Sequence, residues 1–341
     1  MYGPKDIRLE ETEIPEIGAN EILLRVQSAA ICGTDVRMFN NGHKLIHDRA
    51  PRILGHELSG VIAGVGRNLR GYREGTAVAV APNMGCGICD ECVGGNTHQC
   101  RDYQALGINL DGGFAEYVRI PEAAVRQGNV IALDRRVTFE EAALNEPLSC
   151  VYNGFLQCRI KPGDNVLIIG AGPIGLMHAK LAKMAGAARV LINDLSEERL
   201  QICRRVDDAL ITIPSDGLKE QIFDLTQGKG VNVCITACPA PQAQAAALEL
   251  MATGGTVNFF GGLPASQEMV TLNTNLIHYK QLVITGSARA NVLQFRTTLK
   301  LIADGLVDVK GLISAKFALP QIIDGFRSAD QASGLKNVIG F

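Results

Sequence analysis

Tryptophan is absent from the 341 residues of this chain, and aromatic residues make up only 5% of it. So few aromatic side chains argue against a surface on which nucleic-acid bases stack. The net charge of −2 is also small, which argues against a nucleic acid or an anionic membrane as the main partner. The longest apolar stretch begins at Val166 and meets Lys180, so no membrane span is expected. Residues 1–6 contain no apolar stretch typical of a signal peptide, and we therefore expect a cytoplasmic protein.

Ten cysteines and 37 glycines are the notable features of the composition. The hydrophobic fraction of 47% and the charged fraction of 20% are those of an ordinary globular protein, and the length is enough for two domains. A chain of this size needs no disulfides to fold, and in a reducing cytoplasm clustered cysteines indicate metal ligands. Abundant glycine indicates tight turns or close approaches of the backbone to a ligand.

The pattern of expected secondary structure changes near residue 150. Before it, short β-like runs separated by turns predict a small, irregular β barrel; these runs are 22–26, 60–66, 77–81 and 114–118. From residue 160, strands alternate with helices, which predicts a parallel sheet with helices on both faces. The expected strands are 165–169, 190–193, 231–236 and 256–260, and the expected helices are 173–185 and 241–251. The tail, which we expect to return to the first domain, contains predicted helices at 291–303 and 320–329 and a strand at 337–339.

Four cysteines lie within fifteen residues in the pattern Cys-x2-Cys-x2-Cys-x7-Cys. They are Cys86, Cys89, Cys92 and Cys100. Short spacers let consecutive thiolates bind one tetrahedral zinc ion, and the glycines at 85, 87, 94 and 95 let the backbone fold around it. Because protein ligands fill all four positions, this zinc is expected to be structural. The alternatives are unliganded cysteines or an iron–sulfur cluster. A nucleic-acid-binding zinc ribbon is disfavoured, because few basic residues flank the segment.

The segment Gly170-Ala171-Gly172-Pro173-Ile174-Gly175 matches the pattern G-x-G-x-x-G. It follows the expected strand 165–169, opens an expected helix and precedes Asp194 at the end of the next strand, which is the context of a dinucleotide-binding site. The first glycine would form the turn, the second would let the pyrophosphate approach the helix N-terminus, and the third would pack helix on strand. Asp194 would bind the ribose hydroxyls, which favours NAD over NADP, and Arg199, one helical turn on, weakens that preference. A glycine turn without a ligand is the alternative.

Three further segments contain metal-binding side chains: Cys32-Gly33-Thr34-Asp35, Gly55-His56-Glu57 and Glu146-Pro147-Leu148-Ser149-Cys150. One cysteine, one histidine and one or two carboxylates suit a zinc ion that keeps an exchangeable position. Spacing does not show that these residues meet, and a lone cysteine or histidine is more often a core residue. From the residues alone, a shared site and separate core residues both stay open.

Together these motifs resemble the zinc-dependent medium-chain alcohol dehydrogenases, and within them the sorbitol (polyol) dehydrogenase branch. The resemblance covers nearly the whole chain. It rests, in chain order, on Cys32-Gly33-Thr34-Asp35, Gly55-His56-Glu57, the four-cysteine segment, Gly112-Gly113-Phe114-Ala115-Glu116-Tyr117, Glu146-Pro147-Leu148-Ser149 and Gly170–Gly175.

The resemblance implies an α/β chain with a GroES-like catalytic domain and a doubly wound Rossmann coenzyme domain, with the active site in the cleft between them. The implied catalytic domain is 1–148, with a structural zinc lobe at 85–101 and a return at 288–341, and the coenzyme domain is 149–287. A catalytic zinc is implied on Cys32, His56 and Glu57, with Glu146 as a fourth, exchangeable or water-mediated ligand. Two zinc ions per chain follow, and a homodimer or homotetramer is expected.

The resemblance also implies the chemistry. Zinc would lower the pKa of the substrate hydroxyl, the Thr34 hydroxyl would pass the proton outward, and hydride would move from the carbinol carbon to NAD. Thr34, Glu57 and Glu146 are thus the implied catalytic residues, and a glutamate at 146 favours polyols or sugar alcohols. Ser287 and Arg289 resemble the segment of sorbitol dehydrogenases that contacts cofactor and polyol. A surface ion pair is the alternative for Arg289.

The chain departs from the family pattern in three places. Arg37 stands where the family has a relay histidine, so proton exit would use solvent, the ribose hydroxyl, His43 or His47. The chain also begins several residues later than the family's usual first strand, and Ala290 replaces an aromatic residue that contacts substrate. Arg37 and Lys44 add positive charge near the pocket mouth, which permits a phosphorylated sugar alcohol; a solvated charged loop is the alternative.

The predicted function is therefore the zinc- and NAD-dependent oxidation of a polyol, sugar alcohol or secondary alcohol to a ketone or aldehyde. The same scaffold would also serve a sugar-alcohol phosphate or a threonine-type amino alcohol. A non-catalytic NAD-binding scaffold protein is a more distant alternative, because the metal- and cofactor-binding residues are intact.

Overall fold

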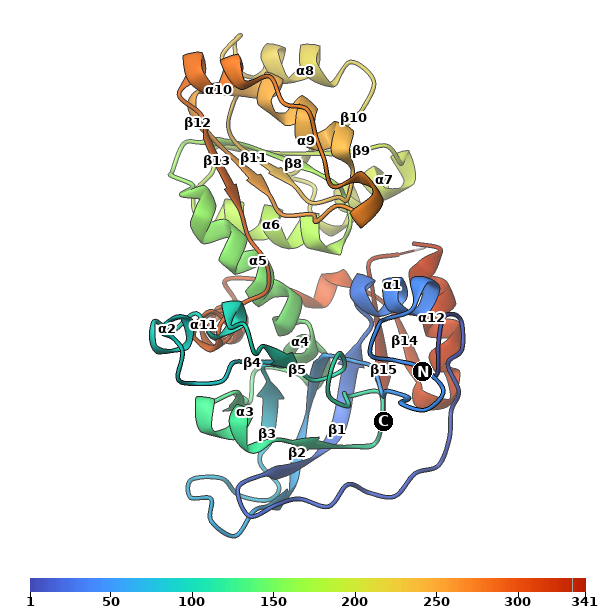
Figure 1. The fold of residues 1–341 in the computed structure, drawn as a ribbon. Coiled ribbons are helices and arrows are strands. Elements are labelled where there is room, and N and C mark those ends of the chain that lie inside the picture. The colour runs from blue at the N-terminus through green and yellow to red at the C-terminus, as the bar shows by residue number, and fades with distance from the viewer. Residues whose placement is uncertain (333) are drawn as a thin grey trace. The chain divides into compact units, whose positions relative to one another are not determined.

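The computed structural model describes residues 1–332 and 334–341. The chain divides into two compact units (Figure 1), which we call unit 1 (Met1–Ser149 with Arg289–Phe341) and unit 2 (Cys150–Ala288). The domain boundaries expected from the sequence, 148/149 and 287/288, each lie one residue before these divisions. In the part of the chain that the structure describes, every helix is too short or too polar to cross a membrane.

A seven-stranded, largely antiparallel sheet forms the centre of unit 1. Its strands run in the order β14-β15-β1-β2-β3-β7, and β6 pairs with β1. The bounds are β1 (Ile22–Ala30), β2 (Glu57–Val65), β3 (Ala77–Val80), β6 (Tyr117–Ile120), β7 (Val130–Ala132), β14 (Ile313–Ala318) and β15 (Lys336–Gly340). Alternate side chains of β1, from Ile22, Leu24 and Val26, are completely buried, as expected for a strand with one face on the core. Because β15 pairs with β1, the C-terminal strand belongs to the same sheet as the first strand of the chain.

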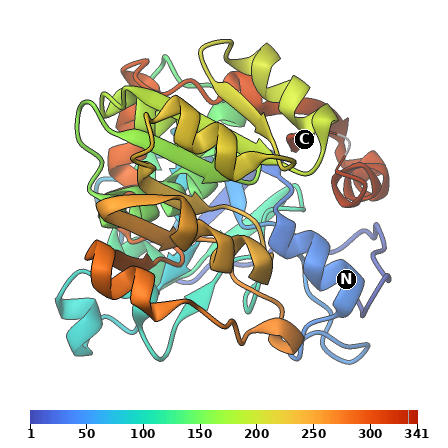
Figure 2. The ribbon, with the colours of Figure 1, turned by 90° about the horizontal axis from the view of Figure 1, so that it is seen from above.

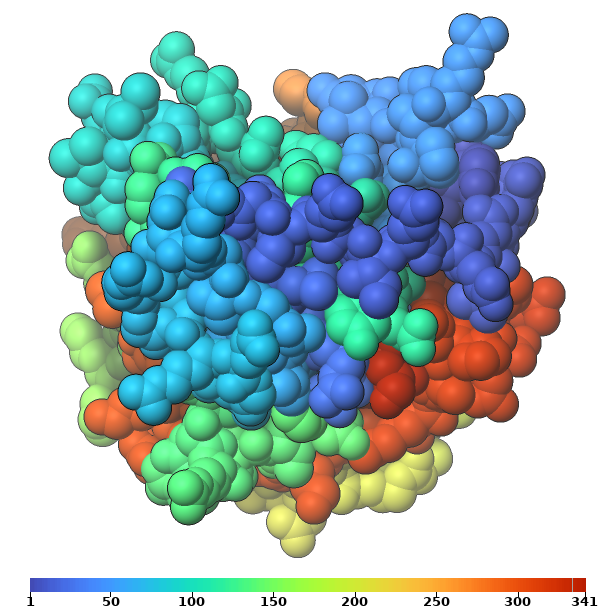
Figure 3. All heavy atoms as spheres, turned by 90° about the horizontal axis from the view of Figure 1, so that it is seen from below, coloured from blue at the N-terminus to red at the C-terminus, as the bar shows by residue number. Residues whose placement is uncertain are grey.

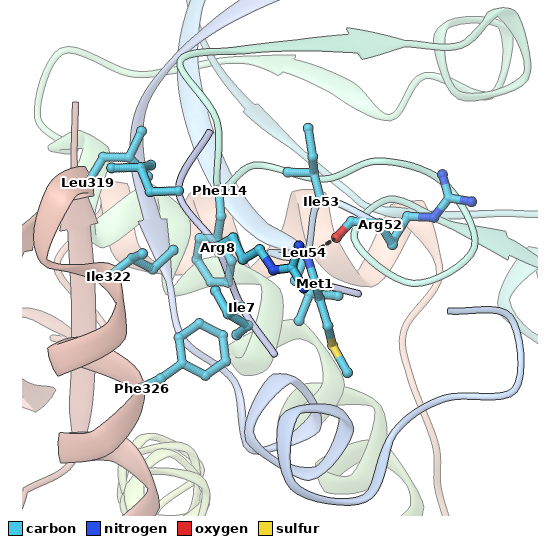
Figure 4. A pocket seen from close by; sticks show the side chains of 11 residues that line it. Met1, Ile7, Arg8, Arg52, Ile53, Leu54, Phe114, Leu319, Ile322 and Phe326 are labelled. Carbon is cyan, nitrogen blue, oxygen red and sulfur yellow. Dashed lines mark hydrogen bonds between the residues drawn. The ribbon is translucent and has the colours of Figure 1, made fainter. Parts of the chain in front are cut away.

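Short helices and turns surround this sheet. They are α1 (Gly33–Asn41), α2 (Asp90–Val93), α3 (Glu122–Gln127), α4 (Phe139–Ala143), α11 (Val292–Ala303) and α12 (Ile322–Asp330), with the 3-10 turns η1 (Thr97–Gln99), η4 (Lys310–Leu312) and η5 (Leu319–Gln321) and the small pair β4 (Asn83–Met84) and β5 (Gln104–Ala105). The ring of Phe326 on α12 packs against Phe39 and Phe114, each with a centroid distance of 5.7 Å. Figure 4 shows Phe326 and Phe114 at a cavity of about 70 Å³, whose lining also includes Arg8 and Arg52. Residues 8–16, which are mostly exposed, run over the surface of unit 1 (Figure 3).

Unit 2 is built on a six-stranded parallel sheet in the order β10-β9-β8-β11-β12-β13. The bounds are β8 (Asn165–Ile169), β9 (Arg189–Asp194), β10 (Ile211–Pro214), β11 (Val231–Thr236), β12 (Met251–Phe259) and β13 (Val283–Gly286). Counted from β8, this is the order 3-2-1-4-5-6 of a doubly wound dinucleotide-binding sheet. The strand order reverses between β8 and β11, and ligands bind such sheets at the carboxyl ends of these strands.

Helices cover both faces of the sheet in unit 2 (Figures 1 and 2). They are α5 (Asn145–Cys158), which begins in unit 1, α6 (Pro173–Met184), α7 (Glu197–Val206), α8 (Leu218–Leu225), α9 (Pro241–Ala247) and α10 (Thr274–Lys280), with the turns η2 (Leu248–Leu250) and η3 (Ala265–Gln267). The predicted pairing of a β-rich part with a parallel-sheet part is confirmed.

Two expected elements differ from the structure. The strand expected at 114–118 begins only at Tyr117, because the backbone before it bonds to the segment that precedes His56 instead: N–H of Phe114 donates to the carbonyl of Leu54 at 3.0 Å. The helix expected at 241–251 ends at Ala247, because Met251 already pairs with β11 as the first residue of β12.

Candidate active site and zinc centres

Cys32 lies two residues after strand β1, at the N-cap of α1. Its backbone N–H donates to Oδ2 of Asp35 at 2.9 Å, and Asp35 is completely buried. A carboxylate three residues into a helix that bonds back to the cap is a strong helix-start signal. This contact fixes the backbone turn between β1 and α1, where Cys32 lies. Thr34 then lies in the first turn of α1.

His56 and Glu57 enter the same region at the start of β2. In the pairing of β1 with β2, Glu57 stands opposite Ala30, which brings it close to Cys32. The preceding Gly55 has φ +94°, and a Cβ there would lie only 2.9 Å from the ring of Phe114. Glycine is therefore required at position 55, because a side chain there would collide with the ring of Phe114.

The sulfur of Cys32, a ring nitrogen of His56 and a carboxylate oxygen of Glu57 all lie within 4.8 Å of one another. Oδ1 of Asp35 is 3.4 Å from Nδ1 of His56, which leaves Nε2 as the nitrogen available to a metal. Burial lowers the pKa of His56, but the charges of Asp35 and Cys32 outweigh burial and raise this pKa well above its usual value. The surroundings of the imidazole are therefore negative and favour a cation.

A buried ion pair holds Glu57. Nζ of Lys336, on β15, donates to Oε2 of Glu57 and, at 2.8 Å, to the backbone carbonyl of Ile31. Glu57 is completely buried and Lys336 is 4% exposed, so neither charge is solvated by water. Oε1 of Glu57 has no hydrogen-bond partner among the described residues, which leaves it available to a metal.

A thiol, an imidazole and a carboxylate oxygen without a partner are the donor set of a zinc site that keeps an open position. Glu146 is not part of this group. It is buried at the start of α5, next to Asn145, whose side chain donates to the carbonyl of Phe295 at 2.9 Å. Its role as a fourth ligand stays a prediction. Sequence reasoning assigned no role to Asp35 or Lys336. Asp35 is part of the motif Cys-Gly-Thr-Asp, whereas no local signal marks Lys336.

The four cysteines of the predicted lobe also converge. The sulfur atoms of Cys86, Cys89, Cys92 and Cys100 lie within 4.8 Å of one another. A Cβ at Gly85 would lie 2.4 Å from the sulfur of Cys92, so the backbone wraps the cluster too closely for a side chain there. Backbone N–H groups of Ile88 and Cys89 lower the pKa of the Cys86 thiol to about 6. Four converging sulfurs within a tight backbone fit a closed, structural zinc site.

The glycine-rich segment has the geometry of a dinucleotide-binding loop. Gly170 has φ +116°, and a Cβ on Gly175 would lie 1.9 Å from the carbonyl oxygen of Gly170, so both positions require glycine. Gly172 is the N-cap of α6, Pro173 is its first residue and Ile174 follows. A Cβ on Gly172 would meet nothing within 4 Å, which leaves space for a ligand at the positive end of the helix.

Asp194 ends strand β9 beside this loop. One carboxylate oxygen accepts from N–H of Ala171 at 2.8 Å, the other from N–H of Ser196 at 2.9 Å, and the guanidinium of Arg199 lies 3.7 Å away. The carboxylate is thus fixed at the loop and partly neutralised by Arg199.

Ser287 and Arg289 lie at the end of unit 2 and the start of the returning segment. The hydroxyl of Ser287 lies 3.5 Å from Oδ1 of Asn258, near the carboxyl end of β12. Arg289 contacts the cysteine lobe: its guanidinium donates to the carbonyl of His98 at 3.0 Å and lies 3.9 Å from the ring centre of Tyr103. The sequence had not indicated this contact with the lobe.

Two family models match the chain. Residues 18–129 match the alcohol dehydrogenase GroES-like domain, and residues 173–304 match the zinc-binding dehydrogenase family. The chain is 32% identical over 336 residues to a sorbitol dehydrogenase of Bacillus subtilis, covering 97% of the chain and 92% of the relative. It is 34% identical over 324 residues to an L-threonine 3-dehydrogenase of Bacillus velezensis, covering 93% and 90%.

Solved structures of dehydrogenases are also similar to this chain. An alcohol dehydrogenase of Escherichia coli in complex with NADH has a TM-score of 0.89 at 28% identity, covering 100% of this chain and 97% of that one. A galactitol-1-phosphate dehydrogenase of Escherichia coli has a TM-score of 0.88 at 28% identity, covering 99% and 98%. The chain therefore belongs to the zinc-dependent alcohol dehydrogenase family, in its sorbitol (polyol) dehydrogenase-like branch, and is an oxidoreductase that acts on an alcohol.

Proposed function

We propose that this enzyme oxidises a polyol or sugar alcohol at a secondary carbinol, with zinc as Lewis acid and NAD as hydride acceptor. The observation that carries the proposal is the convergence of Cys32, His56 and Glu57 on one point, in a chain related to a sorbitol dehydrogenase. Zinc bound by these residues supplies a Lewis acid that lowers the pKa of the substrate hydroxyl.

In unit 1, residues that contact the proposed zinc ligands orient them. Oδ1 of Asp35 lies 3.4 Å from Nδ1 of His56 and favours the tautomer with the proton on Nδ1, and Lys336 donates to Glu57. Thr34, in the first turn of α1, accepts the proton of the substrate hydroxyl and passes it outward. Glu146 serves as the exchangeable or water-mediated fourth ligand.

In unit 2, the N-terminus of α6 binds the pyrophosphate of NAD and Asp194 binds the ribose. Arg199 lies 3.7 Å from the Asp194 carboxylate and weakens its repulsion of a 2′-phosphate. NAD is therefore the preferred cofactor, and the preference depends on the balance between these two side chains.

A second candidate substrate class is favoured by unpaired positive charge. Arg37 and Lys44 are exposed, and neither makes a salt bridge with any carboxylate in the described residues. Both lie close enough to His43 to lower its pKa further, in addition to the larger effect of burial. Arg37 is one helical turn beyond Thr34 on the same face of α1. A phosphate on the substrate would find two cations here, and a relative in structure acts on galactitol 1-phosphate.

NADH formation, followed by absorbance, tests both candidates. The panel contains sugar alcohols, their phosphates, secondary alcohols and threonine, each with NAD and with NADP. The main proposal expects the highest kcat/KM with an unphosphorylated polyol and NAD. A preference for phosphates that disappears in Arg37→Gln would select the second candidate. Turnover of threonine alone, or no turnover of any compound, would refute both.

We also propose that the enzyme is a cytoplasmic homodimer or homotetramer. The support is the edge of the parallel sheet: β13 is its last strand, and Val283 on it and Tyr279 nearby are 51% and 76% exposed. Light scattering of the purified protein measures the assembly, and Val283→Lys is expected to shift it toward monomers. A monomeric wild type would refute the proposal.

A further inference from the structure

A cavity of about 570 Å³, which we call the amino-edge cavity, lies at the amino ends of three strands of unit 2. Its lining includes Asn165 at the start of β8, Asn232 in β11 and Met251 at the start of β12. The sheet is parallel, so this edge lies opposite the carboxyl ends of the strands, where the glycine-rich loop follows β8. The five residues of β8 separate the two ends by about 16 Å. The cavity is therefore distinct from the proposed dinucleotide site, and its volume is typical of a small-molecule site.

The backbone around the amino-edge cavity is closely packed. The pairing of β11 with β12 shifts register at this edge, so β12 bulges, and Ala252 and Thr253 of the bulge line the cavity. Gly230, also a lining residue, has φ +84°, and a Cβ there would lie 2.6 Å from the carbonyl oxygen of Leu250. The turn before β11 therefore packs directly on the backbone before β12. Bulges of this kind are over-represented next to functional sites.

Two cations without a carboxylate partner line the cavity. Lys229 is exposed and Lys280 is half-buried, and neither makes a salt bridge with any described carboxylate. Glu249, whose charge reaches Lys280, is already paired with Lys219 at 2.8 Å. Nζ of Lys280 donates to the carbonyl of Met251 at 2.7 Å, which fixes the ammonium and leaves two of its N–H groups for a ligand. Burial lowers the pKa of Lys280, with a smaller contribution from Lys219, so a nearby anion would stabilise its charged form.

Neutral groups complete the site. Oδ1 of Asn232 accepts from N–H of Asn165 at 2.9 Å, which holds the side-chain amide, and Nδ2 of Asn232 has no partner among the described residues. Thr253 adds an exposed hydroxyl and Phe223 adds an aromatic ring. The helices α8 and α10, which contribute Phe223 and Lys280, lie at the same end of unit 2 (Figure 1). Ammonium and amide N–H groups bind the oxygens of a phosphate, whereas a ring and a hydroxyl suit the organic part of a ligand.

We propose that the amino-edge cavity binds a small organic phosphate. Lys229 and Lys280 bind the phosphate group, and Asn232 donates to one of its oxygens. Phe223 contacts the organic part, since inorganic phosphate alone would leave most of the cavity empty. The cavity shares no residue with the proposed catalytic and dinucleotide sites, so this ligand is neither the substrate nor the coenzyme. The proposal does not depend on the proposed polyol oxidation.

Isothermal titration calorimetry tests the proposal. The zinc-loaded enzyme is saturated with NADH, so that the dinucleotide site is filled, and titrated with glycerol 3-phosphate, ribose 5-phosphate and glucose 6-phosphate. At least one of them should bind about ten-fold tighter than its unphosphorylated counterpart and than inorganic phosphate. Lys229→Met and Lys280→Met should each raise its Kd about five-fold or more, whereas Lys300→Met, a change at an exposed lysine of α11, should leave it unchanged. Binding of none of the three, or an unchanged Kd in either cavity variant, would overturn the proposal.

Hydrogen–deuterium exchange locates the bound phosphate. The expected result is slower exchange in peptides that cover residues 226–232 and 250–256. Slower exchange confined to residues 33–47, together with a Kd that rises in Arg37→Gln, would place the phosphate in the substrate site and overturn the proposal. The side chain of Lys229 makes no hydrogen bond among the described residues. Lys229→Met therefore keeps the test valid if Lys280→Met, which loses the bond to Met251, does not fold.

Discussion

Replacing Lys336 by methionine removes the cation that bonds to buried Glu57. The side chain of Glu57 would keep its charge in a site without water, and the carbonyl of Ile31 would lose a donor at 2.8 Å. Removing one partner of a buried ion pair costs about 3–5 kcal/mol, because the other charge is left uncompensated. In a unit of roughly 200 residues, a loss of this size lowers Tm by on the order of 10 °C.

The metal changes the expected size of this effect. A zinc ion beside Glu57 would compensate the carboxylate, so Lys336→Met should lose less stability with zinc added back than after dialysis against a chelator. Urea unfolding followed by far-ultraviolet circular dichroism measures both states. Adding Glu57→Gln to Lys336→Met removes the unpaired charge and should recover about 2 kcal/mol in the chelated protein. A loss below about 1 kcal/mol in the chelated single variant, or no recovery in the double variant, would show that Lys336 does not compensate the charge of Glu57.

Three further predictions concern other parts of the chain. Cys100→Ser should release one of two zinc ions in metal analysis and lower the stability of unit 1; retention of both ions would contradict the lobe assignment. Asp194→Asn should lower the ratio of kcat/KM for NAD to that for NADP about ten-fold, since Arg199 would then face a 2′-phosphate without its partner carboxylate; an unchanged ratio would contradict the role of Asp194. His178 is buried without a hydrogen-bond partner among the described residues, and burial lowers its pKa to about 3. Because the unfolded chain binds this proton near pH 6.5 and the folded chain does not, stability should fall below pH 6.5 by about 1.4 kcal/mol per pH unit, and His178→Leu should reduce that dependence. Urea unfolding at pH 8 and pH 5 measures it, and the same slope in His178→Leu would show that other groups cause it.

Secondary structure that depends on neighbouring residues could be predicted from the sequence. The strand at 231–236 agrees residue for residue, and helix α6 ends one residue before its expected end. The glycines at 170 and 175 were assigned a turn and a packing role, and their backbone conformation and contacts agree with both. In each case the type and spacing of nearby residues determine the local structure, so it can be predicted without knowing which distant segments are in contact.

The features that could not be predicted from the sequence depend on contacts between segments that are far apart along the chain. Lys336 pairs with Glu57 across 279 residues, and Arg289 meets His98 across 191, so no spacing rule reveals either contact. Strand β14 was expected only as a strand-loop stretch, because its buried and exposed positions are set by pairing with β15. For the same reason, the residues alone do not show that Cys32 and His56 converge. Their convergence follows from the register in which β1 pairs with β2.

Diffraction data collected at the zinc absorption edge would show whether Cys32, His56 and Glu57 bind one zinc ion. Two anomalous peaks per chain are expected, one among the four cysteine sulfurs and one among Sγ of Cys32, the ring of His56 and a carboxylate oxygen of Glu57. In Cys32→Ser the second peak should weaken or vanish while the first remains. A single peak at the lobe in zinc-saturated wild-type crystals would mean that Cys32, His56 and Glu57 do not bind zinc.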